Sequence, residues 1–116
     1  MHSEELAKLV VEALDEVKAV NVRVIDVRGI TSITDYMVIA SGRTDRQVRA
    51  LAEKVEATAR EHGVTPLGME GQREGEWVLL DLGDVVVHSM QPAARDFYQL
   101  EKLWADAAGQ EQSAVH

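Results

Sequence analysis

The stretch Trp77-Val-Leu-Leu-Asp-Leu-Gly-Asp-Val-Val-Val-His-Ser-Met90 decides the fold of this chain. Its pattern predicts two strands joined by a tight turn at Gly83-Asp84. Side chains alternate between the two faces of a strand, yet here both faces are apolar. Trp77 and Leu79 share one face, and the residues at 78 and 80 share the other. Both faces of this ribbon, residues 77–90, therefore need cover, either from the chain's own helices or from another protein.

Length, charge and composition narrow the class of protein. A chain of 116 residues is long enough for one domain with a single modest core. The sequence has no cysteine, which excludes disulfides and thiolate zinc sites. A formal net charge of -8 disfavours broad nucleic-acid binding and suits a basic protein partner. The apolar runs are too short to span a membrane and the start is acidic, so we expect a cytoplasmic protein without membrane contact.

Apolar residues at helical spacing predict three helices. Ser3 is the expected cap of the first, which buries positions 6, 9, 10, 13, 14 and 17. Thr44 starts the second with a Thr44-x-x-Gln47 capping box, and Gly63 is its expected stop. The buried stripe of this second helix is expected to be Val48, Leu51, Ala52, Val55 and Ala59.

The third helix is expected to begin at Pro92 and to end at Gly109. Its predicted inward positions are Phe97, Leu100, Trp104 and Ala107. We therefore expect one domain over residues 1–109, followed by a flexible C-terminal tail over residues 110–116.

Five strands complete the predicted domain. Besides the two strands of the ribbon, residues 22–28, 35–41 and 66–70 have strand character, and the second of these is too apolar for a sheet edge. A strand–helix–strand order around residues 36–70 implies one right-handed parallel crossover, and the short connections elsewhere imply antiparallel neighbours. The sequence thus predicts an α+β fold, with a mixed five-stranded sheet flanked by three helices.

Several motifs in a fixed order make the chain similar to a known family. It resembles the ribosomal silencing factor family, also called Iojap, from about residue 4 to residue 107. The motifs are Ile33-Thr-Asp-Tyr-Met-Val-Ile-Ala-Ser-Gly42, Arg46-Gln47-Val48, Glu70-Gly71, Trp77 to His88, Arg95, Tyr98, Leu100-Glu101 and Leu103-Trp104.

This resemblance implies a fold related to the nucleotidyltransferases, a role without catalysis, and no cofactor or metal. It implies binding to the large ribosomal subunit through its ribosomal protein L-fourteen, on the face that meets the small subunit. Occupying that face would sterically prevent subunit joining and lower translation when nutrients are scarce. Members of the family are often homodimers.

Six residues in the ribbon and in the helix after it are candidate partner contacts. Trp77 and Leu79 could be core residues beneath a helix, but three helices also have three other strands to cover, so we favour contact with a partner. Asp81 could shape the turn or meet basic residues of the partner. The other candidates, for which packing between ribbon and helix is an equal alternative, are Met90, Arg95 and Tyr98.

Three arginines near the start of the second helix form a separate candidate site. Arg43, Arg46 and Arg49 oppose the helix dipole there, so something must offset their charge. They could contact a phosphate or ribosomal RNA. We favour the alternative, in which they pair with Asp45, Glu53 or other acidic residues.

A nucleotidyltransferase-like, nucleotide-binding enzyme is the alternative function. Such enzymes place a Gly-Ser loop at a helix start and two carboxylates on a strand that hold magnesium. Ser41-Gly42 precedes a helix, but no Asp-x-Asp or Asp-x-Glu strand follows. Asp81 and Asp84 are separated by a turn, and His88 is a lone strand histidine, more typical of a core or surface position than of catalysis. We therefore expect no catalysis and no metal.

Overall fold

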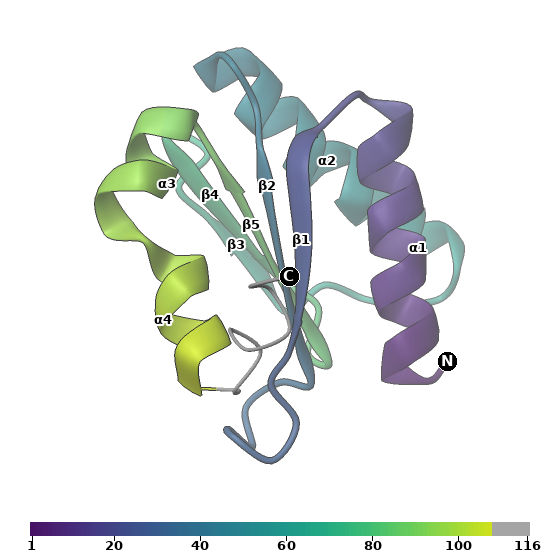
Figure 1. The fold of residues 1–116 in the computed structure, drawn as a ribbon. Coiled ribbons are helices and arrows are strands. Elements are labelled where there is room, and N and C mark those ends of the chain that lie inside the picture. The colour runs from purple at the N-terminus through teal and green to yellow at the C-terminus, as the bar shows by residue number, and fades with distance from the viewer. Residues whose placement is uncertain (108–116) are drawn as a thin grey trace.

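A five-stranded sheet lies between two layers of helices in the computed structural model, which describes residues 1–107 (Figure 1). The α+β class and the mixed five-stranded sheet are as predicted, and the relation to nucleotidyltransferases stays a prediction. The elements in chain order are α1 (Ser3–Glu16), β1 (Val20–Asp26), β2 (Tyr36–Ser41), α2 (Asp45–Glu61), β3 (Gly68–Glu70), β4 (Trp77–Asp81), β5 (Val85–Met90), α3 (Pro92–Tyr98) and α4 (Leu100–Ala107).

The strand order in the sheet is β1-β2-β5-β4-β3. β2 and β5 are parallel, and the other neighbouring pairs are antiparallel. β3 therefore runs parallel to β2, as the predicted crossover requires, but β5 and β4 lie between them. β2 is buried at every position, which confirms that it is a central strand. The sheet is mixed because the hairpin of β4 and β5 enters between the two ends of the crossover.

The predicted turn of the ribbon joins β4 to β5. Gly83 has a φ of 87°, a left-handed conformation that glycine adopts without strain. The Asp81 carboxylate accepts a hydrogen bond of 2.8 Å from the Gly83 N–H. Asp81 therefore shapes the turn, which is one of the two roles that the sequence predicts for it.

α1 and α2 cover one face of the sheet and form the larger core with it (Figure 1). All five positions of the predicted stripe of α2 are buried. The cap of α1 is His2 rather than Ser3, because Ser3 is already helical and the Glu5 carboxylate accepts a hydrogen bond from the His2 backbone N–H. The fully buried side chains of this core include Val10, Leu14, Val38, Leu51, Val55 and Leu80.

The capping box of α2 is confirmed in a modified form. The Thr44 hydroxyl accepts a 3.0 Å hydrogen bond from the Gln47 N–H, as predicted. The Gln47 side chain reaches back one residue further than a standard box, to the Arg43 N–H at 2.8 Å. At the other end, Gly63 follows the last turn with a φ of 80° and provides the predicted stop.

The predicted last helix is broken in two. Gln99 has a left-handed conformation, with φ of 49°, and separates α3 from α4. Leu100 and Trp104 turn inward as predicted, but Phe97 is 79% exposed, so its predicted core position was wrong. The helix changes direction at this break, so positions that would line one side of a straight helix do not all face the sheet. The expectations for the Ala107 side chain, Gly109 and the tail over 110–116 lie outside the described residues.

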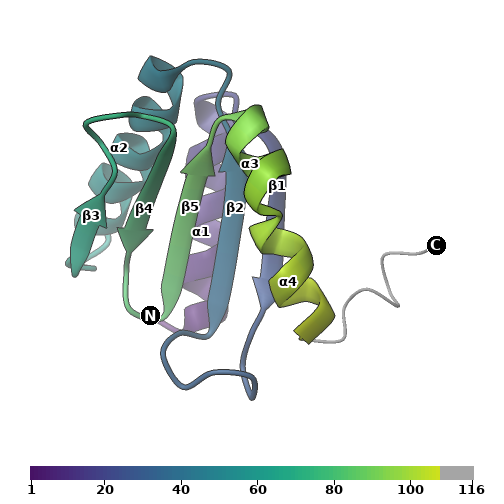
Figure 2. The same cartoon turned by 90° about the vertical axis from the view of Figure 1, so that its left-hand side faces the viewer.

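α3 and α4 lie over β5, β2 and β1, and leave the same face of β4 and β3 without a helix (Figure 2). Within residues 1–107, no helix is long and apolar enough to cross a membrane. The sheet therefore has one face covered by α1 and α2, and a second face covered by α3 and α4 over only part of its width.

Candidate partner-binding face

The register of the sheet shows which side chains share the second face. Residues opposite each other in paired strands point to the same side. One row across the sheet is Glu70, Leu79, His88, Ile39 and Arg23. The rows on either side contain Asp81, Val86, Met37 and Ile25, and Trp77, Met90 and Ser41. The candidate residues of the ribbon therefore lie on the face that carries α3 and α4.

The covered half of this second face is a closed core. Beneath α3 and α4 lie Ile25, Val27, Met37, Ile39 and Met90, and Ala94, Leu100 and Trp104 of these helices pack against them. Met90 has no exposed surface. Its expected contact with a partner is therefore corrected to a core position, because the Trp77 side chain and α3 close over it.

The open half of the second face consists of Trp77, Leu79, Asp81 and Val86. All four are half-buried, while Val78 and Leu80 on the opposite face of β4 are fully buried. Both faces of the ribbon are thus apolar as predicted, and only one of them is closed. Trp77 and Leu79 share the open half, although they are partly packed and not fully exposed. Their contact with a partner stays a prediction.

Trp77 lies in a chain of rings that continues onto α3. Its indole centroid is 5.8 Å from the His88 ring and 5.0 Å from the Tyr98 ring, and Phe97 packs edge-on against Tyr98 at 4.9 Å. Tyr98 is 52% exposed, and its contact with a partner stays a prediction. These rings form an aromatic row that runs from the open half on β4 to the outer side of α3.

Sequence reasoning missed two residues of this surface. Phe97 faces inward only if the helix is straight, and the break at Gln99 removes that condition. His88 was set aside as a lone histidine. A two-residue turn at 83–84 already places residue 88 opposite Leu79 and diagonal to Trp77, so the register held a usable signal.

His88 is an almost buried polar residue beneath the Trp77 ring. It is 5% exposed, and its Nδ1 accepts a 3.0 Å hydrogen bond from the indole N–H of Trp77. Burial lowers the pKa of His88 from 6.5 to about 4, because the charged imidazolium loses its hydration there. The ring is therefore neutral at pH 7, with its proton on Nε2.

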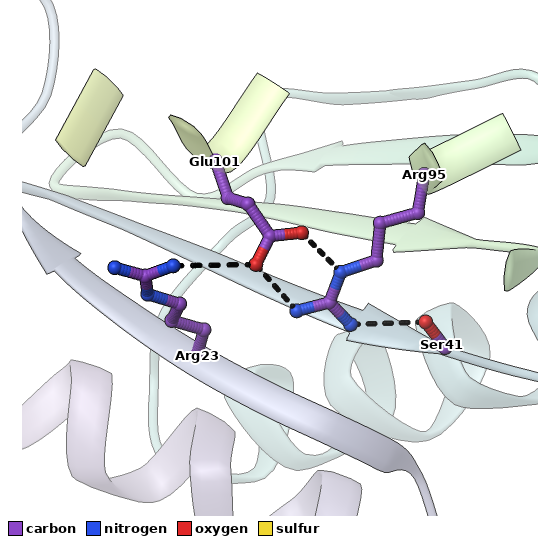
Figure 3. Close-up of polar contacts among 4 residues, drawn as sticks. All are labelled: Arg23, Ser41, Arg95 and Glu101. Carbon is purple, nitrogen blue, oxygen red and sulfur yellow. Dashed lines mark hydrogen bonds and ion pairs between the residues drawn. The ribbon is translucent and has the colours of Figure 1, made fainter. Parts of the chain in front are cut away.

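Arg95 joins α3 to α4 and to the sheet (Figure 3). Its Nε and Nη2 donate to the two carboxylate oxygens of Glu101 at 2.5 and 2.9 Å, and its Nη1 donates to the Ser41 hydroxyl at 2.9 Å. Arg23 lies 3.6 Å from the same carboxylate, and hydrogen bonding to Arg95 is the main cause that lowers the pKa of Glu101. The Arg95 side chain is only 11% exposed. Arg95 therefore ties α3 and α4 to the sheet, and its contact with a partner stays a prediction.

The three arginines of the other candidate site belong to the start of α2, on the opposite face of the sheet. Arg49 pairs with Asp45 at 3.5 Å, as the favoured alternative predicted. Arg43 and Arg46 are exposed. A phosphate or RNA contact at these residues stays a prediction.

The carboxylates that a nucleotidyltransferase-like enzyme would need do not come together in a metal site. Asp81 is held by the turn and Asp84 is exposed. Among the described residues, no three His, Asp or Glu side chains come together in a way that could hold a metal ion.

The structure is an α+β domain whose sheet keeps part of one apolar face accessible. The family model described as "Ribosomal silencing factor during starvation" matches residues 1–116. The chain belongs to this family of ribosomal silencing factors, whose role is the regulation of translation in association with the ribosome.

Individual relatives agree with this assignment. The ribosomal silencing factor of Chromobacterium violaceum is 46% identical over 104 residues, which are 90% of this chain and 85% of that protein. A crystal structure of a protein from the same organism matches with a TM-score of 0.89 at 46% identity, over 90% of this chain and 88% of that one. A mouse protein named for mitochondrial assembly of the ribosomal large subunit is 32% identical over 99 residues, 83% of this chain and 43% of that protein.

Proposed function

We propose that this protein binds the large ribosomal subunit through its ribosomal protein L-fourteen, with the open half of the sheet as the contact surface. Bound there, it occupies the face that the small subunit must reach, so that the two subunits cannot join. Translation then falls when nutrients are scarce. It acts in the cytoplasm as a binding protein without catalysis, and forms a homodimer when free.

The observation that carries the proposal is the open half itself. Trp77 and Leu79 keep part of their apolar surface accessible on a sheet face that the helices within residues 1–107 leave uncovered, and Tyr98 borders them. Tryptophan and tyrosine are the residues that most often dominate binding energy at protein interfaces. A rigid sheet also presents them at little cost in conformational entropy.

Charge supports a basic ribosomal partner. The formal net charge of -8 attracts a positively charged protein surface and speeds the encounter with it. Asp81 lies on the open half, where its half-buried carboxylate can meet a cation while it keeps its bond to the turn. The name of the mouse relative supports the large subunit as the place of action.

A homodimer follows from the same surface. An apolar half-face without a partner favours self-association, because two copies can cover each other's open half. The dimer and the ribosomal complex would then compete for the same residues.

Sedimentation with isolated ribosomal subunits tests the proposal. The protein should co-sediment with large subunits and not with small ones, and it should lower the yield of joined ribosomes when small subunits are added. Leu79→Asp should abolish both effects. Ile33→Asp is the matched control, because it places the same charge on an 81% exposed apolar residue of the β1–β2 connection, outside the sheet.

Recovery of the protein with both subunits, or with neither, would contradict the proposal. Equal loss of binding in the Leu79 and Ile33 variants would contradict the assignment of the open half.

A further inference from the structure

The hydrogen bond between Trp77 and His88 is an unusual feature for the middle of a sheet. His88 stands between Leu79 of β4 and Ile39 of β2, so both of its direct neighbours in the row are apolar. A buried polar group in such a row costs free energy unless it is paired. Its ring is paired with the indole N–H of Trp77, the largest side chain on the open half.

The bond depends on the state of the imidazole. Nδ1 can accept a hydrogen bond from the indole N–H only while it carries no proton. Burial keeps His88 neutral at physiological pH. The charged groups that share its face lie further along the sheet or are engaged with each other. Glu70 and Arg23 end its row, Asp81 binds the turn, and Arg95 on α3 is paired with Glu101.

Trp77 is therefore held from two sides. The bond of 3.0 Å to His88 fixes the edge of the indole, and the Tyr98 ring packs against it at 5.0 Å with an interplanar angle of 48°. A side chain fixed before binding loses little rotamer entropy when the complex forms. The same bond also uses the only hydrogen-bond donor of the indole.

We infer that His88 is a positioning residue of the binding surface: it holds the Trp77 ring in the orientation that meets the partner and makes that ring a purely apolar contact. The inference rests on the proposed function. It also specifies the partner, which must present aliphatic or aromatic carbon to the exposed part of Trp77 and not a hydrogen-bond acceptor.

Two substitutions separate this role from simple packing. His88→Leu fills the buried site with an apolar side chain but removes the acceptor. His88→Asn keeps an acceptor, because the amide oxygen can occupy the place of Nδ1. We expect His88→Leu to weaken binding to the large subunit by about fivefold or more, the effect of one lost positioning hydrogen bond, and His88→Asn to stay within about twofold of the wild type. Thermal melts of both variants confirm that each is folded.

The bond itself can be measured without any ribosome. In an NMR spectrum of the free protein, the Trp77 indole N–H should be protected from exchange with solvent, and Trp104→Phe identifies which of the two indole signals it is. His88→Leu should remove this protection and His88→Asn should keep it.

The possible outcomes distinguish the inference from the proposed function. A Trp77 indole proton that exchanges freely in the wild type would overturn the positioning role, and so would unchanged binding by a folded His88→Leu variant. Equal weakening by both folded variants would overturn it as well, because the acceptor would then be irrelevant. A wild-type protein with a protected indole that binds no large subunit would overturn the proposed function, and the assigned role of His88 with it.

Discussion

The two halves of the second sheet face have similar apolar residues but different surroundings. Beneath α3 and α4, Met37, Ile39 and Met90 are shut away from water, while Trp77 and Leu79 on the neighbouring strand keep accessible surface. The difference arises from the helices, because α4 reaches across to β1 and none of the described helices lies over β4 on this side (Figure 2). Equal hydrophobicity in a sequence can therefore serve stability in one place and binding in another.

Among single substitutions, the largest loss of stability should come from the covered half of the second sheet face. Met90→Ala removes a fully buried side chain and leaves a cavity between β5 and α3. We expect the free energy of unfolding to fall by about 2–5 kcal/mol, as measured by denaturant titration. Binding by the fraction that is still folded should change little. A variant with unchanged stability would mean that this half is not a closed core.

A second test measures how the free energy of unfolding depends on pH through His88, which lies between the covered half and the open half. The folded protein binds a proton at His88 more weakly than the unfolded chain does, because the folded pKa is about 4 and the ordinary value is 6.5. The stabilising contribution is therefore complete above pH 6.5 and is lost as the pH falls toward 4, by about 3 kcal/mol at most.

Denaturant titrations at several pH values should show this loss in the wild type and a flatter profile in His88→Asn. Glu101 is the internal reference, because its pKa is lowered from 4.5 and its own loss of stabilisation belongs to more acidic solutions. A His88→Asn profile as steep as that of the wild type between pH 6.5 and 4 would show that His88 is not shielded from protons.

The smallest effect on the fold should come from the open half. Trp77→Ala should weaken binding to ribosomal protein L-fourteen by about 2 kcal/mol, while the unfolding free energy falls less than it does for Met90→Ala, because the ring is only half-buried. Calorimetric titration and a denaturant titration of each variant measure the two quantities.

Phe97→Ala is the matched aromatic control. Its ring is 79% exposed, so stability should change by less than about 0.5 kcal/mol. A Trp77 variant that loses as much stability as the Met90 variant would remove the distinction between the halves.

Much of the fold could be predicted because its signals are local. The apolar run of β2, the turn at Gly83 and the cap and stripe of α2 depend on residues close in sequence, and the structure confirms them. The break at Gln99 could not be predicted from periodicity, because it depends on Arg95 and Glu101 meeting across it and on α4 reaching β1. The exposure of Phe97 follows from that break.

The candidate site was predicted in part for the same reason. Trp77 and Leu79 share a face because strands alternate, which the sequence alone shows. Whether that face is covered depends on where α3 and α4 pack, a tertiary property, and this is why Met90 was wrongly placed at the surface. His88 needed the strand register before its partner could be recognised.

The strand order has a consequence for how the chain folds during synthesis. β5 is the last of the five described strands to be made, yet it lies in the middle of the sheet between β2 and β4. Until residues 85–90 have left the ribosome, β2 keeps one edge unpaired, and the pair of β3 and β4 has no strand that connects it to β2. Unpaired edges of apolar strands are prone to aggregation. A nascent chain of this protein is thus most vulnerable just before its final strand closes the sheet.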